Sequence, residues 1–160
     1  MKLTLRAVGR MKSGPERELL DRYVDRATKA GRAIGITDIS ILETGESRAG
    51  NAAMRRSEEA GALLSGLPPS TCLICLDERG RDEGSAALAR FVQARLDDGT
   101  PEISFLIGGP DGHGEEIRQK AARIMSFGKS TWPHQLVRVM ATEQIYRAIT
   151  ILTGHPYHRE

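Results

Sequence analysis

The sequence lacks the features expected of a membrane protein, an exported protein or a metal protein. Its longest uninterrupted apolar runs are a handful of residues, whereas a membrane helix needs roughly 18 to 20. Charged residues interrupt the apolar ones over residues 1–6, so we expect no signal peptide and a cytoplasmic location. The best metal candidates are His155 and His158, but no third or fourth ligand has suitable spacing, so we expect no metal.

The sequence has only two cysteines, Cys72 and Cys75, and their Cys-x-x-Cys spacing raises the question of a redox or zinc site. They lie in an apolar run typical of a strand, where residues three apart face opposite sides of the sheet. A redox pair needs both sulfurs together, usually at a helix N-terminus, and no second pair completes a zinc site. We therefore predict two small side chains in the core.

Aromatic residues are scarce, and most of them lie in a basic C-terminal quarter. The net charge is only +2, but residues 117–160 hold seven Lys or Arg against two Glu. Four of the seven aromatic residues lie in the same segment. Basic side chains interleaved with rings suit a polyanion with stackable bases, although a solvated helix face with core aromatics explains the composition equally well.

Strands and helices alternate along the 160 residues, which predicts a single α/β domain with a parallel-rich sheet and helices on both faces. A charged loop is expected over residues 77–84, and a capping box over residues 13–16 is expected to start the first helix. The expected strands cover residues 2–8, 37–42, 71–76, 102–107 and 124–127. The expected helices cover residues 15–30, 52–64, 85–96, 115–123 and 134–152.

Ligands of parallel α/β sheets bind beyond the carboxyl ends of the strands, and three loops are candidates: those after Leu76, Ile107 and Phe127. The second is the glycine run 108–114, which lets a flat ligand approach the backbone closely. It has neither dinucleotide-binding nor P-loop spacing, so a tight structural turn is an equal alternative. The third loop, 128–134, offers polar groups for an adenine or amino-acid moiety, or Thr131 or Trp132 could simply cap the next helix.

The last helix and the tail after it carry the remaining candidate groups. Apolar residues of the helix form a broad stripe, suited to the core and to a helix pair across a twofold axis. Glu143 and Arg147 are spaced i, i+4, for which an exposed salt link of about 0.3–0.5 kcal/mol is the simplest interpretation. The tail 155–159 combines a ring, titratable groups and a phosphate-binding fork, so we expect substrate contact there.

Four segments in this order resemble the RlmH family, the ribosomal RNA large subunit methyltransferase H enzymes. The first residues and the Leu-Asp pair at the end of the third strand also match, so the resemblance covers the whole chain. The segments are Phe-Leu-Ile-Gly-Gly-Pro-Asp-Gly (105–112), Trp-Pro-His-Gln-Leu-Val-Arg-Val (132–139), Glu-Gln-Ile-Tyr-Arg-Ala (143–148) and His-Pro-Tyr-His-Arg-Glu (155–160).

The resemblance implies the SPOUT fold, a parallel sheet whose C-terminal segment forms a deep trefoil knot. It implies a homodimer that transfers a methyl group from S-adenosylmethionine to N3 of pseudouridine-1915 in 23S rRNA of the assembled 70S ribosome, without metal or membrane. The last helix would form much of the dimer interface. The cofactor pocket would be lined by Leu76, Gly108, Phe127, Gly128, Lys129, Ser130, Thr131 and Trp132.

Catalytic roles follow as hypotheses from the paired charges and the tail. The uracil N3 is mostly protonated at neutral pH, so a base or a set of donors should assist its reaction. Glu143 is the candidate base, and Arg147 would orient it or stabilise charge. Tyr157, His158 and Arg159 would hold the RNA, from the same or the other subunit. Two alternatives are a SPOUT methyltransferase for another rRNA or tRNA base, and a non-catalytic ribosome-binding factor.

Overall fold

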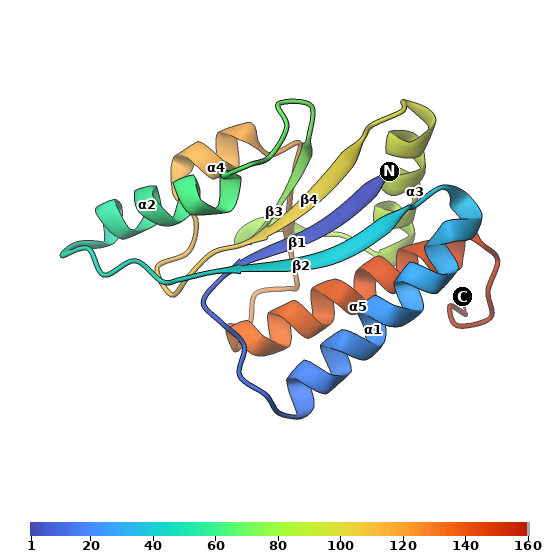
Figure 1. Ribbon diagram of the computed structural model, residues 1–160, viewed down its shortest axis with the longest axis horizontal. Helices are drawn as coiled ribbons and strands as arrows, with labels where there is room; N and C mark the ends of the chain where they lie inside the picture. The colour runs from blue at the N-terminus through green and yellow to red at the C-terminus, as the bar shows by residue number, and fades with distance from the viewer. Residues whose placement is uncertain (160) are drawn as a thin grey trace.

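The computed structural model describes residues 1–159 and contains a five-stranded sheet in which all neighbouring strands are parallel. The strand order is β2-β1-β4-β3-β5, so all five carboxyl ends meet at one edge (Figure 1). The parallel α/β prediction is confirmed, and the C-terminal trefoil knot stays a prediction. The strands are β1 (Lys2–Val8), β2 (Asp38–Thr44), β3 (Cys72–Asp82), β4 (Glu102–Ile107) and β5 (Arg123–Ser126).

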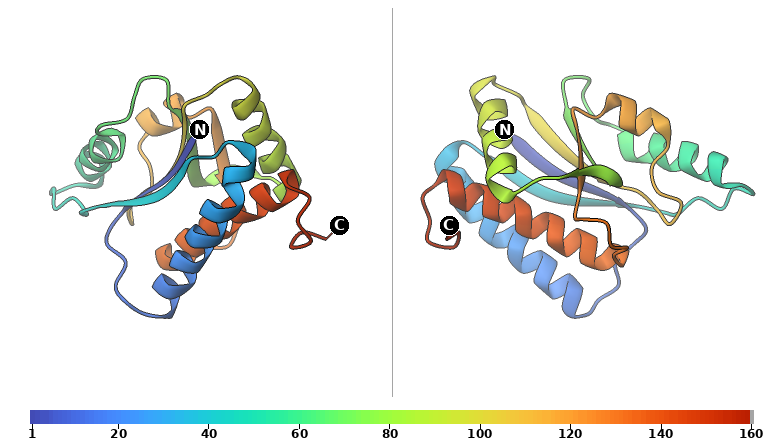
Figure 2. Two further views of the ribbon diagram at one scale, coloured as in Figure 1. Left: turned by 45° about the vertical axis from the view of Figure 1, so that its right-hand side comes forward. Right: turned by 180° about the vertical axis from the view of Figure 1, so that it is seen from behind.

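Within residues 1–159, five α-helices and one 3₁₀ turn accompany the sheet. Helices α1, α3 and α5 pack on one face, and α2 and α4 pack on the other (Figures 1 and 2). None of these helices is long and apolar enough to cross a membrane. The helices are α1 (Pro15–Gly31), α2 (Ala52–Leu64), α3 (Ser85–Asp97), α4 (Glu115–Lys120) and α5 (His134–Leu152), and the 3₁₀ turn is Arg32–Ile34.

The two cysteines face opposite layers, as the strand pattern predicts. Cys75 is fully buried in the cluster under α2 and α4, whereas Cys72 is only half-buried and packs against the cluster under α1, α3 and α5. Burial raises the pKa of the Cys75 thiol to about 12, so this sulfur stays protonated and unreactive at neutral pH.

The charged stretch after Leu76 is part of a strand, so the predicted loop over residues 77–84 is wrong. β3 continues to Asp82, with a register shift against β5 between Leu76 and Arg81. Gly80 allows this passage because a Cβ there would lie 2.5 Å from the carbonyl carbon of Met125. Charge along the chain suggested a loop, but pairing with a distant strand supplies the hydrogen bonds that keep the stretch extended.

One predicted capping motif and one predicted helix end are also wrong. The N-cap of α1 is Gly14, without a side-chain cap, so no capping box forms. Pro15 begins the helix instead, with a fixed φ that suits this position. Helix α4 ends at Lys120 rather than near Arg123, because Arg123 pairs with Ile74 as the first residue of β5.

The guanidinium of Arg138 fastens α5 to the end of β1. Its side chain is 3% exposed and donates to the carbonyl oxygens of Val8 at 2.7 Å and Gly9 at 3.0 Å. It also donates to Glu43 Oε1 at 2.9 Å, an oxygen that accepts from Arg17 at 3.3 Å. Burial lowers the pKa of Arg138, and the Glu43 carboxylate opposes this shift. The charge is tolerated in the interior because Nη1 and Nη2 have acceptors and Glu43 supplies the counter-charge, although Nε has no partner among residues 1–159.

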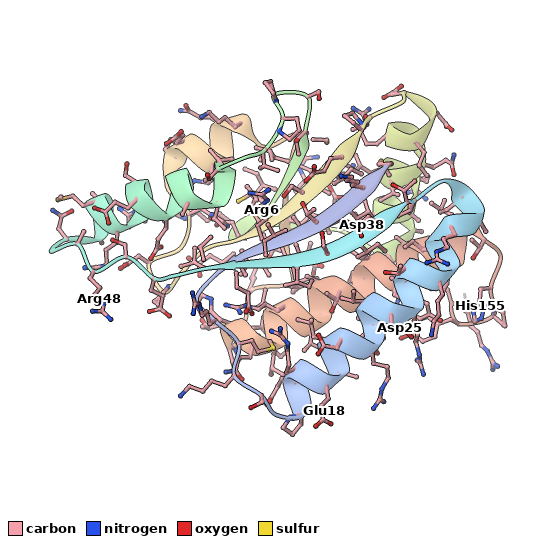
Figure 3. All side chains as sticks on the ribbon, viewed as in Figure 1. Arg6, Glu18, Asp25, Asp38, Arg48 and His155 are labelled. Carbon is pink, nitrogen blue, oxygen red and sulfur yellow. The ribbon has the colours of Figure 1, made fainter. Side chains whose placement is uncertain are left out.

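A second buried arginine, Arg6, binds the C-terminal end of α2 to the opposite face of the sheet. Arg6, labelled on β1 in Figure 3, donates to the carbonyl oxygens of Leu63 at 3.0 Å and Ser65 at 2.7 Å. These carbonyls end α2, where the helix dipole favours a cation. One strand therefore anchors helices on both faces of the sheet.

We predict that Arg138→Met lowers the free energy of unfolding by about 3 kcal/mol, because it leaves the half-buried Glu43 and two backbone carbonyls without their main donor. Urea denaturation followed by circular dichroism measures this loss. The control, Arg26→Met at an exposed position of α1, should stay within about 0.5 kcal/mol. A loss below about 1 kcal/mol in Arg138→Met would contradict the anchoring role.

Candidate functional site

The candidate site is a cavity of about 510 Å³ at the carboxyl edge of the sheet. Its walls are residues 76–79 in β3, the loop 107–113 after β4, and residues 125–132 in and after β5. These are the three segments predicted from the strand pattern, although the first of them is strand and not loop. Arg56 of α2 adds a cation from one face of the sheet, and His134 begins α5 on the other. The volume suits a small-molecule ligand.

The glycine run forms a tight turn that presents backbone to the cavity. Gly112 donates its N–H to Gly109 O at 2.9 Å and has a φ of +72°, which favours glycine. A Cβ at Gly108 would lie 2.9 Å from the carbonyl carbon of Gly112, so no side chain fits there. The two interpretations left open for this run, a structural turn and a ligand loop, are therefore compatible.

A partly buried ion pair and a buried histidine form another part of the wall. Arg118 Nη1 donates to Asp77 Oδ2 at 3.0 Å and to the carbonyl oxygen of His113 at 2.7 Å. His113 Nε2 lies 3.1 Å from Leu106 O, and burial lowers the pKa of this histidine. All three side chains line the cavity, and none was predicted as a site residue. Only Asp77 gave a signal, because it directly follows the buried apolar run of β3.

The loop before α5 closes the cavity. Trp132 donates its Nε1–H to Phe127 O at 3.1 Å, and its ring is 42% exposed. Neither Thr131 nor Trp132 caps the helix, since the N-cap is Pro133 without a side-chain bond. Seven of the eight predicted cofactor residues line the cavity: Leu76, Gly108, Phe127, Gly128, Ser130, Thr131 and Trp132. Lys129 belongs to the same loop but is exposed and outside the lining.

Four of the five predicted catalytic residues gather at the other end of α5. Glu143 Oε1 accepts from Arg147 Nε at 2.8 Å and from the Tyr157 hydroxyl at 3.0 Å. The Arg147 guanidinium lies 4.8 Å from the Tyr157 ring centroid, and its Nη1 lies 3.5 Å from His158 Nδ1. The Glu143 side chain is only 16% exposed, so the interpretation as an exposed salt link is wrong. Arg159 is exposed.

Tyr157 is the centre of this tail cluster, which we define as Glu143, Arg147, Tyr157 and His158. Its hydroxyl also lies 3.3 Å from that of Tyr23 on α1. Burial, together with these hydrogen bonds, raises the pKa of Tyr157, so the phenol is a donor at neutral pH. The tail is therefore ordered against α1 and α5, where chain ends usually fray.

The tail cluster and the large cavity are separate within one chain. Among residues 1–159, Arg147, Tyr157 and His158 do not contribute to the cavity lining. Thirteen residues separate His134 at the cavity from Arg147, about 20 Å along the helix axis. Figure 1 shows the C-terminal tail at the far end of α5. A second, smaller cavity of about 280 Å³ includes Glu143 and shares Phe127 with the first.

Within residues 1–159, no group of three or more His, Cys, Asp or Glu side chains is placed to hold a metal ion. The polar groups of the large cavity include backbone of the glycine run, the hydroxyls of Ser130 and Thr131, and the Asp77 and Asp111 carboxylates paired with arginines. This arrangement defines the class of the protein: an α/β protein with an organic-ligand site at the carboxyl edge of a parallel sheet.

Comparison with known proteins identifies the family. The family described as "Predicted SPOUT methyltransferase" matches residues 1–158. The chain is 51% identical to the Ribosomal RNA large subunit methyltransferase H of Bradyrhizobium diazoefficiens over 99% of both chains, and equally so to that of Xanthobacter autotrophicus. This chain belongs to the SPOUT methyltransferases and, among them, to the ribosomal RNA large subunit methyltransferase H family.

The fold agrees with a solved structure of more distant sequence. The crystal structure of a probable methyltransferase from Bordetella pertussis superposes with a TM-score of 0.50 at 17% identity, covering 92% of this chain and 95% of the other. At this identity the similarity concerns the fold alone.

We predict that His113 makes stability pH-dependent. Its pKa is lowered in the folded protein, so below its unfolded value of about 6.5 the unfolded chain binds a proton that the folded chain does not. Stability should therefore fall as pH falls through 6.5, with a slope of at most about 1.4 kcal/mol per pH unit from this group. Urea denaturation at several pH values between 5 and 7.5 measures the slope.

His113→Gln should flatten this slope, because the amide can still donate to Leu106 O but does not titrate. His155→Gln, at an exposed position (Figure 3), should leave the slope unchanged. Equal slopes in wild type and His113→Gln would show that another group causes the loss of stability at acidic pH.

Proposed function

We propose that this protein is a cytoplasmic, homodimeric methyltransferase that uses S-adenosylmethionine to methylate N3 of pseudouridine-1915 in 23S rRNA of the assembled ribosome. The observation that carries the proposal is the glycine-backed cavity at the carboxyl edge of the sheet. It occurs in a chain that aligns over nearly its whole length with relatives named ribosomal RNA large subunit methyltransferases.

The residues of the cavity fit S-adenosylmethionine. The volume of about 510 Å³ accommodates a ligand of this size. The turn at Gly108 offers bare backbone where a side chain would collide, so a flat base can approach it closely. Ser130 and Thr131 offer hydroxyls beside it. Leu76, Gly108 and residues 127–132 would hold the cofactor, which supplies an electrophilic methyl group on a sulfonium sulfur.

The chain's own residues must then orient the RNA and accept a proton from uracil N3. Glu143 is the candidate acceptor, but both its oxygens already have donors. Oε1 accepts from Arg147 and Tyr157, and Oε2 accepts from Gln144 Nε2 at 2.7 Å. Glu143 can therefore accept a proton from the RNA only after one of these donors leaves. Movement of the tail would withdraw the Tyr157 hydroxyl and free that position on Oε1.

A homodimer supplies a reason for the tail to move. Within one chain Arg147 lies about 20 Å along α5 from His134 at the cavity, and neither Tyr157 nor His158 lines the cavity, so these groups are poorly placed to act on a base held there. The rim and the exposed side of α5 present apolar surface for a partner, with Trp132 42% and Leu136 39% exposed. In a twofold pair, the tail of one subunit can approach the cavity of the other. We propose that Tyr157, His158 and Arg159 act there on the RNA.

We predict methyl transfer from labelled S-adenosylmethionine to 23S rRNA in 70S ribosomes, with at least tenfold less transfer to separated subunits or free rRNA. Mass spectrometry of rRNA fragments locates the product at pseudouridine-1915. Transfer to another rRNA base or to tRNA would overturn the proposed substrate. Ribosome binding without cofactor binding would indicate a non-catalytic factor.

Glu143→Gln tests the proposed base within the same assay. It keeps the size of the side chain and removes its basicity, so S-adenosylmethionine binding should persist while the single-turnover rate falls about 100-fold. A rate within a factor of two of wild type would exclude Glu143 as the base.

We predict that two inactive variants complement each other if the tail acts across the dimer. Ser130→Trp, at an exposed position of the cavity lining, blocks the cavity, and deletion of residues 157–160 removes the tail. Each homodimer should be inactive, but a mixed dimer has one open cavity beside one intact tail. Mixing the unfolded chains and refolding them should recover up to about a quarter of wild-type activity. No recovery, in mixtures shown by mass spectrometry to contain mixed dimers, would place each tail at its own cavity.

A further inference from the structure

Helix α2 reaches the rim of the large cavity through an arginine that no family motif covers. Arg55 Nε donates to Asp111 Oδ2 at 2.6 Å, and Nη2 donates to Oδ1 at 3.1 Å. This two-pronged pair joins α2 to the glycine run 108–114. The remaining nitrogen, Nη1, donates to Ala49 O at 3.1 Å, so the same guanidinium also holds the loop 45–51 that precedes α2.

One helical turn further along α2, Glu59 touches the same two loops. Its Oε1 accepts from the backbone N–H of Ser47 at 3.0 Å. Its Oε2 lies against Gly109, where a Cβ would approach within 2.7 Å. Glu59 is 4% exposed, and this second oxygen has no hydrogen-bond partner among residues 1–159. The buried carboxylate of Glu59 therefore packs against the glycine run that forms the cavity wall.

The N-terminal half of α2 depends on these polar contacts for its position. Ala60 and Leu63, in the C-terminal half, are buried against the sheet, whereas Met54 in the first turn is 53% exposed. Asn51 caps the helix by accepting from Met54 N–H at 2.8 Å. Figure 3 shows Arg48, in the preceding loop, pointing outward from the molecule. Arg56 of this half lines the cavity itself, whereas Arg55 and Glu59 connect the helix to the glycine run that forms the cavity wall.

We infer that α2 is a positioning arm for the cofactor pocket, in which Arg55 and Glu59 hold the glycine run in the shape that receives S-adenosylmethionine. The inference rests on the proposed function, since it concerns the same pocket. A glycine-rich segment has many backbone conformations open to it, and binding is weakened by the fraction of time it spends outside the competent one. The Arg55 side chain also lowers the pKa of Asp111, which keeps this carboxylate charged and paired.

The test is a double-mutant cycle on the Arg55–Asp111 pair, read by calorimetric titration with S-adenosylmethionine. Arg55→Gln and Asp111→Asn should each weaken binding about tenfold. The double variant should be no weaker than either single one, because both remove one interaction. The KM for the cofactor should rise by the same factor, while kcat at saturating cofactor stays within twofold. Glu59→Ala, which removes the second contact, should weaken binding in the same direction.

Hydrogen exchange of the cofactor-free protein gives an independent readout. Amides of residues 108–114 should exchange faster in Arg55→Gln than in wild type, while those of β4 are unchanged. The control breaks an exposed ion pair on α1, Lys29–Asp25, which also has a short contact of 2.7 Å. Lys29→Gln should alter neither the affinity nor the exchange. If Arg55→Gln fails to fold, Asp111→Asn tests the same contact from the loop side.

The outcomes separate this inference from the proposed function. Failure of the wild-type protein to bind S-adenosylmethionine would overturn both. Normal binding by wild type, with unchanged affinity and exchange in Arg55→Gln and Asp111→Asn, would overturn the positioning role alone. Equal losses of kcat and affinity would assign the pair to the reaction itself and also overturn the role proposed for it.

Discussion

The placement of α5 depends on one buried charge. Arg138 enters the interior only because β1 ends with two carbonyls turned toward it and Glu43 supplies the counter-charge. Helix α5 has no side-chain cap at its start, so this ion pair, rather than local capping, determines where the helix begins against the sheet. Residues 127–132 connect β5 to that point, and their path closes the cavity. An interaction outside the pocket thus determines the shape of one of its walls.

The two ends of α5 carry different parts of the proposed chemistry. Its first residues border the cavity, and its last turns carry the tail cluster with Tyr157 bonded to Glu143. A single chain keeps these parts apart, and in that state both carboxylate oxygens of Glu143 accept hydrogen bonds from neighbouring side chains. Under the proposed homodimer, assembly and activation are one event. In that dimer, the subunit interface would bring the tail of one subunit to the cavity of the other and remove the Tyr157 hydroxyl from Glu143 at the same time.

The sequence predicted most of the architecture and the location of the site. Strong periodicity placed strands 2–8 and 102–107 and helices 52–64 and 134–152 to the residue, and the strand ends located the cavity loops. Local pattern failed where distant partners decide the outcome. The charged end of β3 becomes a strand through Gly80 and β5, and Arg118 meets Asp77 only after folding. The sequence did not single out Arg55 or Glu59, because their loop partners lie elsewhere in the chain.

The position of β5 and α5 at the end of the chain has a consequence for biosynthesis. Every strand pairs with parallel neighbours, so no two strands adjacent in the sheet can form a local hairpin. The loops after β3 and β4 emerge from the translating ribosome before the segment that closes the cavity over them. A nascent or stalled chain that lacks this segment also leaves the sheet face beneath Ile145 and Ile149 uncovered. Such a chain exposes apolar surface and lacks a closed cavity. We therefore expect it to be bound by chaperones or degraded by proteases, and not to act as a partly active enzyme.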